Sequence, residues 1–341
     1  MTLTLNDIWF VLFVVIIGGY LILDGFDMGV GILHVPFART DRERRVLLNS
    51  IGPVWDGNEV WLILGGGVLF AAFPLVYASL FSGFYLAMMA VLLVLILRTV
   101  AIEFRSKRAS GRWRTGWDVV FAVSSAALAL LLGVAFGNVL VGVPLGADGN
   151  IRMSFFELLG PIPLLVGVTT VAMFAMHGSL YLSMKTDEAL QSRIMAWMPR
   201  LMAVFFVLNT LLIAAIVVLH PAILDRYVEQ PWLVIFPAVA LAAILLAWAL
   251  LRAGRRFWAF IASSAMILFL LVSGAAGIFP NLIPSTTGEA NSLTIYNAAS
   301  ADNTLTVMLI IALIGMPFVL LYTAGVYYFF RGKTAVEPTG Y

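Results

Sequence analysis

The sequence contains no cysteine among its 341 residues. Disulfides, thiolate zinc sites, iron–sulfur clusters and cysteine nucleophiles are therefore excluded. Charge is also scarce, because only 11% of the residues are charged while 62% are hydrophobic, whereas soluble domains carry about 25% charged residues. A chain of this length cannot bury so much apolar surface in one aqueous core, so the sequence predicts a protein whose main solvent is membrane lipid. The net charge of +2 gives no basic footprint for nucleic acid, and we expect no such partner.

The amino-terminal segment lacks the features of a cleaved signal peptide. Its apolar run begins near Ile8 with no cationic segment before it. The run continues past Asp24 and Asp27 without a small-residue cleavage signal. Because a signal peptide would show both features, we interpret this run as a first spanning helix that is retained.

Long apolar runs recur along the whole chain. A membrane-spanning helix needs about 20 mostly apolar residues, and this criterion predicts about nine spans in a single polytopic membrane domain covering residues 1–341. The second and third spans are separated only by the Phe73-Pro74 corner, which we interpret as a tight turn. The predicted spans cover residues 8–33, 51–73, 76–102, 117–141, 161–184, 199–219, 233–251, 257–279 and 303–330.

Basic residues are concentrated in every second loop and in the tail, whereas the loops between hold only Arg152 and Arg226. Basic loops mark the cytoplasmic side of a membrane, so we expect the amino terminus outside and the carboxyl terminus in the cytoplasm. The predicted fold is an all-α, multi-pass protein of the bacterial cytoplasmic (inner) membrane, with two four-helix bundles plus one peripheral helix. The basic residues of these loops are Arg39, Arg42, Arg44, Arg45, Arg105, Lys107, Arg108, Arg112, Arg114, Lys185, Arg193, Arg200, Arg252, Arg255, Arg256, Arg331 and Lys333.

Acidic residues lie inside the first two predicted spans, where an ionisable group costs several kcal/mol unless it is paired or hydrated. Asp24 and Asp27 are three residues apart, as are Asp56 and Glu59, so each pair shares a helix face. Two neighbouring carboxylates in a low dielectric repel each other unless they share a proton. A proton relay uses that property, and our hypothesis is a proton or cation role for these four acids.

A structural role competes with this hypothesis. Arg98, in the third span, can pair with Asp27, Asp56 or Asp118, because buried ions are normally paired. For Arg98 and Asp118 we predict a structural ion pair. Asp118 also lies near the membrane interface, where water can satisfy it. Asp56 can serve as a first-turn acid that complements the dipole of its helix.

The sequence has three histidines, and only His177 lies within a predicted span. A bis-histidine haem needs two ligands from neighbouring helices, and His177 has no such partner. Mixed ligation by histidine and methionine stays open, although we favour a hydrogen-bonded polar residue inside the bundle. Copper and zinc centres need several histidines or cysteines. We therefore predict no metal site and no complete catalytic site in this chain, so that any redox centres lie on a partner.

Two long motifs resemble the second subunit of cytochrome bd-type quinol oxidases. They are LDGFDMGVG at residues 23–31 and NSIGPVWDGNEVWL at residues 49–62. The resemblance covers essentially the whole chain and is densest in its first third. Shorter matches occur at 70–74 (FAAFP), 82–85 (SGFY), 104–107 (FRSK), 133–138 (GVAFGN), 279–285 (FPNLIPS) and 292–295 (SLTI).

The resemblance implies a quinol oxidase that reduces dioxygen to water. It implies two haems b and one haem d, all held by the haem-bearing subunit I, and quinol that is oxidised at that partner. The second subunit is haem-free, stabilises its partner within membrane lipid, and in some members holds a structural quinone; small accessory subunits are further candidate partners. In the family the carboxylate matching Asp56 belongs to a cytoplasmic proton path, and Asp24 and Asp27 match acidic positions. Arg98 and Asp118 match polar positions near the same side.

The sequence departs from this family at two places, and two other functions compete with the oxidase. Some members have glutamine where this chain has Glu59, and an outside insertion between later spans is absent here. An independent proton- or cation-coupled transporter would also use acidic pairs on adjacent helices, but no broken helices recur in corresponding halves. A purely structural scaffold would place every buried acid in an ion pair.

Overall fold

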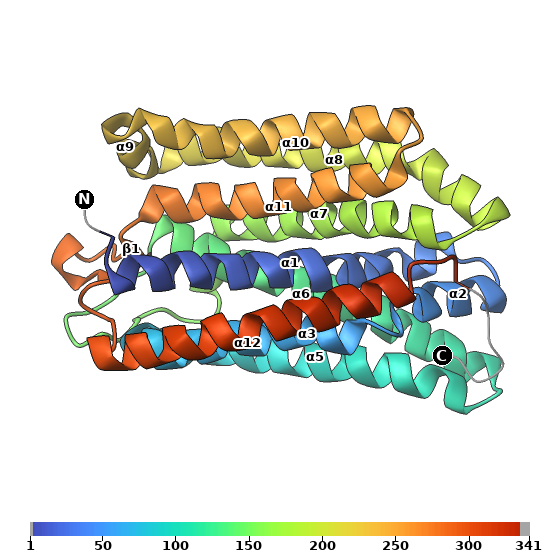
Figure 1. Cartoon of the computed structure of the whole chain (residues 1–341), viewed down its shortest axis with the longest axis horizontal. Helices are drawn as coiled ribbons and strands as arrows, with labels where there is room; N and C mark the ends of the chain where they lie inside the picture. Colours follow the sequence, from blue (N-terminus) through green and yellow to red (C-terminus); the bar gives the residue numbers. More distant parts are fainter. Residues whose placement is uncertain (1–2, 335–341) are drawn as a thin grey trace.

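Long helices run side by side through the protein, whose computed structural model describes residues 3–334 (Figure 1). The predicted all-α, multi-pass architecture is confirmed, because eight helices in the described range are long and apolar enough to cross a membrane. The helices are α1 (Leu5–Phe37), α2 (Asp41–Ile51), α3 (Trp55–Ala72), α4 (Pro74–Gly83), α5 (Tyr85–Phe104), α6 (Gly111–Val141), α7 (Pro161–Lys185), α8 (Glu188–Leu219), α9 (Ala222–Glu229), α10 (Ile235–Arg252), α11 (Arg256–Ile278) and α12 (Asp302–Phe329).

The predicted count of nine spans is not confirmed, and the second predicted span is the reason. Its helix, α3, begins with a turn that carries Asp56, Asn58 and Glu59, and it is not among the eight sufficiently apolar helices. With 18 residues, α3 is about 27 Å long at 1.5 Å per residue, close to the thickness of the hydrocarbon layer. Its crossing of the membrane stays a prediction.

The predicted corner at Phe73-Pro74 is confirmed, because α3 ends at Ala72 and α4 begins at Pro74. Proline suits this first helical position, where its missing N–H leaves no bond unmade. The third predicted span, 76–102, was wrong as one helix, since the chain breaks at Phe84 between α4 and α5. A Cβ at Gly83 would lie 2.5 Å from Ile151, so the glycine lets the outer loop pack against this break.

The two ends of the bundle differ. The Arg-rich connections after α1, α5, α7 and α10 lie at the end that carries α2 (right in Figure 1). The opposite end is covered by the two loops that precede α7 and α12. There β1 (Asn281–Ile283) pairs with the antiparallel β2 (Leu293–Thr294), and Val143 forms a bridge to Ser285. The basic loops therefore share one end, as alternation along the sequence requires.

Helix α1 is the centre of the fold and packs against α3, α6, α7 and α11. Its start is fixed by a capping box, in which Thr4 and Asp7 satisfy each other's backbone N–H groups. The closest approach is to α7, because a Cβ at Gly29 would lie only 2.0 Å from the carbonyl oxygen of Phe174 and 2.8 Å from the Cα of Gly178. The missing side chains of Gly29 and Gly178 therefore let α7 pack directly against the backbone of α1.

The remaining helices pack around this centre. Helices α3, α5 and α6 lie on one side of α1, and α7, α8, α10 and α11 form a consecutive set on the other. Because α6 and α7 also pack closely on each other, the division into two four-helix bundles stays a prediction. Helix α12 contacts α1 and α3, and among its residues only Leu305 is buried.

Candidate functional site

The deepest charges form one ion pair between α1 and α5. Both terminal nitrogens of Arg98 donate to the carboxylate of Asp24, with Nη1 2.8 Å from Oδ2, and both residues are 0% exposed. The three partners expected for Arg98, namely Asp27, Asp56 and Asp118, were therefore wrong. Arg98 lies six residues inside the end of α5, and an arginine that cannot reach water must pair with the acid at its own depth.

Asp27 lies one turn closer to the loop end and is also 0% exposed. Its Oδ2 accepts a hydrogen bond of 2.7 Å from the side-chain amide of Asn58 on α3. The Asn58 oxygen in turn accepts one of 2.8 Å from the hydroxyl of Tyr327 on α12. These contacts and the Arg98–Asp24 pair make up the midspan cluster: Asp24, Asp27, Asn58, Arg98 and Tyr327.

The other two predicted acids, Asp56 and Glu59, form no hydrogen bond with this cluster among the described residues, although Glu59 is close enough to interact electrostatically with Arg98 and Asp24. On α3, Asp56 is exposed and Glu59 is half-buried. The turn that carries them also carries Asn58, which is 2% exposed and points inward. The first turn of α3 therefore presents polar groups both to the interior and to the surface.

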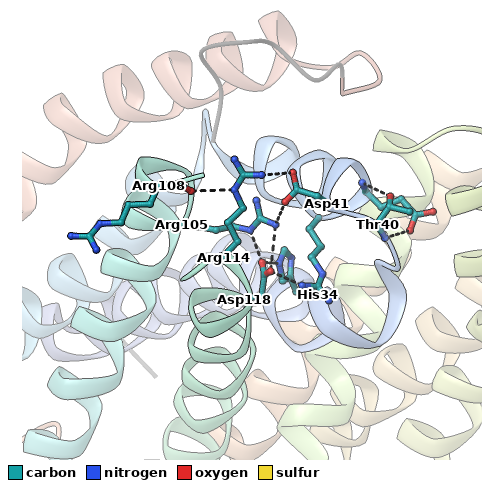
Figure 2. Close-up of polar contacts among 9 residues, drawn as sticks. His34, Thr40, Asp41, Arg105, Arg108, Arg114 and Asp118 are labelled. Atoms are coloured by element: carbon teal, nitrogen blue, oxygen red, sulfur yellow. Dashed lines mark hydrogen bonds and ion pairs between the residues drawn. The ribbon is translucent and has the colours of Figure 1, made fainter. Parts of the chain in front are cut away.

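Asp118 belongs to a second group, at the end of the bundle that carries the basic loops (Figure 2). It is 1% exposed, so its expected solvation at the interface was wrong. Its carboxylate accepts hydrogen bonds from His34 Nε2 at 2.6 Å, from Arg44 Nη1 at 2.7 Å and from Arg105 Nε at 2.5 Å. Asp118 is thus an ion-pair residue, but its partners do not include Arg98.

The same group continues to the surface through Asp41. Arg105 Nη2 donates to Asp41 at 2.8 Å, and Arg114 Nη1 donates to it at 3.1 Å. Figure 2 shows Arg105 lying between Asp118 and Asp41. We call this group the end cluster: His34, Asp41, Arg44, Arg105, Arg114 and Asp118.

A further ion pair fixes α2 at this end. Arg193 donates to Glu43 at 3.1 Å and to the carbonyl of Phe37 at 2.6 Å. Partial burial would raise the pKa of Glu43, but the hydrogen bonds from Arg193 and from the backbone of Arg39 and Thr40 outweigh it. The pKa of Glu43 therefore lies below its ordinary value.

His177 is a hydrogen-bonded residue of the core, as favoured from the sequence. Its Nδ1 lies 2.6 Å from the hydroxyl of Ser263, and its Nε2 lies 3.1 Å from the carbonyl of Ile22. The ring stacks on Phe260 at 4.6 Å. Both ring nitrogens are thus engaged, so the residues around His177 do not fit a haem iron. Within residues 3–334 no group of three His, Cys, Asp or Glu residues could hold a metal ion.

A cavity of about 460 Å³ lies between α1, α6, α7, α8, α10 and α11. Its lining is overwhelmingly apolar, as Phe136 and Leu212 illustrate, with a few polar groups that include Tyr20 and Asn209. Such a space is large enough to hold part of an apolar ligand. Nothing in the sequence indicates it, because its walls come from eight separate helices, including α3 through Leu62 and α9 through Tyr227.

Sequence reasoning gave no role to His34, Asn58, Arg105 or Tyr327. Asn58 and Arg105 lie inside the family motifs at residues 49–62 and 104–107, but neither residue type by itself indicates a buried partner. His34 carries a periodic signal, since it lies seven residues after Asp27 on the same helix face. Tyr327 has no such signal, because only the packing of α12 against α3 brings it to Asn58.

Comparison with known proteins gives consistent relatives. The family described as cytochrome bd terminal oxidase subunit II matches residues 5–330. Cytochrome bd-I ubiquinol oxidase subunit 2 of Escherichia coli (strain K12) is 38% identical over 98% of this chain and 96% of the relative. Cytochrome bd ubiquinol oxidase subunit 2 of Bacillus subtilis (strain 168) is 36% identical over 99% of each.

A solved structure supports the fold. The bd oxidase from Geobacillus thermodenitrificans matches with a TM-score of 0.79 over 96% of this chain and 98% of that chain, at 17% identity. At that identity the likeness shows a shared arrangement of helices and nothing finer. Because the family match and both relatives extend over nearly the whole length, this chain belongs to the cytochrome bd terminal oxidase subunit II family.

Proposed function

We propose that this chain is the haem-free second subunit of a quinol oxidase that reduces dioxygen to water. In this proposal it stabilises a haem-bearing subunit I, which holds two haems b and haem d, and it supplies part of a cytoplasmic proton path. The names of the relatives, which are ubiquinol oxidase subunits, support the reaction. The transporter alternative has no support among these relatives. The observation that carries the proton path is an exposed acid, Asp56, two residues before Asn58, whose side chain donates to the buried Asp27 on α1.

The outer face of α3 is the proposed docking surface for subunit I. Asp56, Val60, Ile63, Gly67 and Phe70 are all exposed and follow one another at alternating intervals of four and three residues. This is the spacing of a helix that packs against another helix. A Cβ at Gly67 would have no atom of residues 3–334 within 4 Å, which leaves room for close approach of a partner backbone. A carboxylate within an otherwise apolar face is costly against lipid, so a partner that pairs or hydrates Asp56 fits this face better.

Photo-crosslinking tests the docking surface. A photoreactive phenylalanine analogue at Ile63, 72% exposed on α3, should crosslink to subunit I in the assembled complex. The matched control is the same analogue at Leu245, 58% exposed on α10, which should not crosslink to it. Equal crosslinking at both positions, or crosslinking from Leu245 alone, contradicts the assignment.

The proton path is tested by Asp56→Asn in the purified complex. The exchange keeps the size of the side chain and removes its proton-carrying charge, so oxygen consumption and proton uptake should both fall while haem content stays normal. Asp302→Asn, at the opposite end of the molecule, is the control and should leave both rates unchanged. Unchanged rates in Asp56→Asn with normal haem content would remove Asp56 from the path.

The apolar cavity is the proposed site of a structural quinone. Its volume of about 460 Å³ and its apolar lining suit an isoprenoid tail, and the side-chain amide of Asn209 can donate to a quinone carbonyl. A quinone held there would brace the helices around it, and we assign it no redox step.

Ile216→Trp fills the cavity from α8 and should lower the quinone extracted per complex. Leu245→Trp lies outside the cavity and should not. Equal quinone in both variants, or none in the parent complex, rejects the site.

We place the chain in the cytoplasmic membrane, with the end that carries the basic loops inside. The concentration of Arg and Lys at that end supports this orientation. A reporter that is active only in the cytoplasm, fused after the carboxyl tail, should be active. The same reporter inserted in the outer loop at Gly149 should be inactive.

A further inference from the structure

One face of α1 links the midspan cluster to the end cluster. Asp24, Asp27, Gly31 and His34 follow one another at intervals of three, four and three residues, so they lie in one line along the helix. Asp24, Asp27 and His34 are each 0% exposed, and Gly31 is buried. An apolar span has no structural need for such a polar line, since each buried polar group must find a partner.

The middle of this line is completed by α6. A Cβ at Gly31 would lie only 2.0 Å from the hydroxyl oxygen of Ser125, so that hydroxyl occupies the place of the missing side chain. Ser125 is 0% exposed, and its oxygen has no hydrogen-bond partner among the described residues. Its neighbour Ser124 differs, because it donates to the carbonyl of Val120 within its own helix. Ser125 is therefore a free polar group at the midpoint between Asp27 and His34.

Both ends of the line also present free polar atoms. Nδ1 of His34 and Oδ1 of Asp27 are buried and have no hydrogen-bond partner within residues 3–334. An unsatisfied buried polar atom costs about 1–3 kcal/mol, and proteins meet such atoms with internal water when the site is polar. Three free polar atoms in one line are the arrangement that a short file of water molecules satisfies.

The distances suit such a file. His34 and Asp27 are seven residues apart, about 10.5 Å along the helix axis at 1.5 Å per residue, and the Ser125 hydroxyl lies between them. Each half of the gap is within reach of one or two bridging waters. The end of the line at His34 opens to solvent through the end cluster. There the Arg44 side chain is 22% exposed and that of Asp41 is 44% exposed.

The charges around His34 suit a neutral relay. Asp118 accepts from His34, and its negative charge is also shared by Arg44 and Arg105. The ring therefore does not have to be protonated to satisfy Asp118. With Nε2–H bonded to Asp118, the free Nδ1 can take up a proton that arrives through the end cluster and release it to water beside Ser125, which returns the ring to its neutral state.

We infer that this face of α1 is a proton-entry route of its own, in which His34 passes protons from the end cluster through the Ser125 hydroxyl and bound water to Asp27. The inference rests on the proposed function, since it supplies protons to the same buried acids. It differs in its starting point, because protons enter inside this chain and do not depend on Asp56 at the docking surface. No covalent bond other than O–H and N–H bonds forms or breaks along the route.

The test uses the intact oxidase complex reconstituted in lipid vesicles, with proton uptake and oxygen consumption normalised to haem. His34→Ala should slow proton uptake by about tenfold. This is less than the full contribution of a positioned proton-transfer group, because water can enter the space that the ring leaves. Added imidazole should restore part of the rate, as it would not for a merely structural defect. His220 lies just after α8, at the opposite end of the molecule from His34. His220→Ala is therefore the control and should match the parent complex.

The serine pair supplies a second arm that does not disturb the ion cluster. Ser125→Ala should slow proton uptake, whereas Ser124→Ala, which removes a neighbouring buried hydroxyl already bonded to its own helix, should not. Equal rates in His34→Ala and the parent, or equal effects of the two serine variants, overturn the route. A slow His34→Ala with a normal Asp56→Asn supports the route and removes Asp56 from the proposed path. The opposite pattern leaves Asp56 in the path and rejects the route.

Discussion

The midspan cluster and the end cluster solve the same problem in different ways. In the midspan cluster one cation, Arg98, faces two acids, and the interactions come from long helices alone. In the end cluster three arginines and one histidine share Asp118 and Asp41, and several of them come from α2 and from the turn after α5. Side-chain exposure is 1% or less for the Arg98–Asp24 pair, but it rises from 0% at Asp118 to 44% at Asp41.

This difference shows how depth determines the redundancy of an ionic group. A charge deep in the bundle has one partner and no access to water, so removal of that partner leaves it unpaired. A charge near the end has several partners and a graded path to solvent, so each single loss is partly compensated. By this rule, the loss of stability on breaking an ion pair should decrease from the midspan cluster to the end cluster to the partly exposed pair of Glu43 and Arg193.

The largest effect is expected for Arg98→Met. It leaves Asp24 and Asp27 in the bundle without a cation, and removal of one partner of a buried pair costs about 3–5 kcal/mol. The measurement is the thermal midpoint of the purified chain in detergent, together with its recovery in the complex. Arg98→Met combined with Asp24→Asn should regain most of the loss, because the acid that Arg98 bonds directly is neutralised as well. A single variant as stable as the parent would contradict the view that this pair has no substitute partner.

A smaller effect is expected for Asp118→Asn. Arg105 keeps its bond to Asp41 and Arg44 can turn to water, so the loss should be about 2 kcal/mol, within the range for unsatisfied buried groups. The same thermal measurement compares it with Arg98→Met. If Asp118→Asn proves the more destabilising of the two, depth does not determine redundancy in this chain.

The smallest effect is expected for Glu43→Gln in the partly exposed pair with Arg193. Glutamine can still satisfy the helix start, so only the charge interaction is lost, at about 0.5–1 kcal/mol near neutral pH. Because the pKa of Glu43 is held below its ordinary value, the carboxylate stabilises the fold above that ordinary value. The advantage is lost as the pH falls through the lowered pKa.

The thermal midpoints of parent and Glu43→Gln should therefore converge as the solution is acidified from neutral pH. Arg152→Ala, which breaks the exposed pair with Asp148 at the other end, is the control and should shift the midpoint at no pH. A difference between parent and Glu43→Gln that stays constant on acidification would assign the effect to the cap and not to the charge.

Much of the fold was predictable from composition, since lipid demands helices and basic loops mark one side. The Phe73-Pro74 corner was also predictable, because proline announces its own helix start. The break at Phe84 was not, since it lies in an apolar stretch and depends on the outer loop at Ile151.

The acids of the site were predictable for a different reason. Asp24 and Asp27 stand out because a charge in an apolar span is costly. Their partners do not stand out, because spacing fixes a helix face but not which neighbour it meets. The three partners predicted for Arg98 were therefore wrong. His34 has the sequence position of an ordinary residue near a helix end, and only the fold brings Asp118 beside it.

The contact of Gly29 with Gly178 has a consequence for experiments on the acids nearby. Two backbones that touch without side chains between them cannot slide past each other, because any shift would drive the carbonyl of Phe174 into α1. The position of Asp27 relative to α7 is therefore determined by the glycine contact at Gly29, two residues further along α1, and not by the charge of Asp27. The backbone packing at this point of the chain does not depend on the charge of Asp27. An uncharged side chain at residue 27 would therefore occupy the same location as the carboxylate that it replaces.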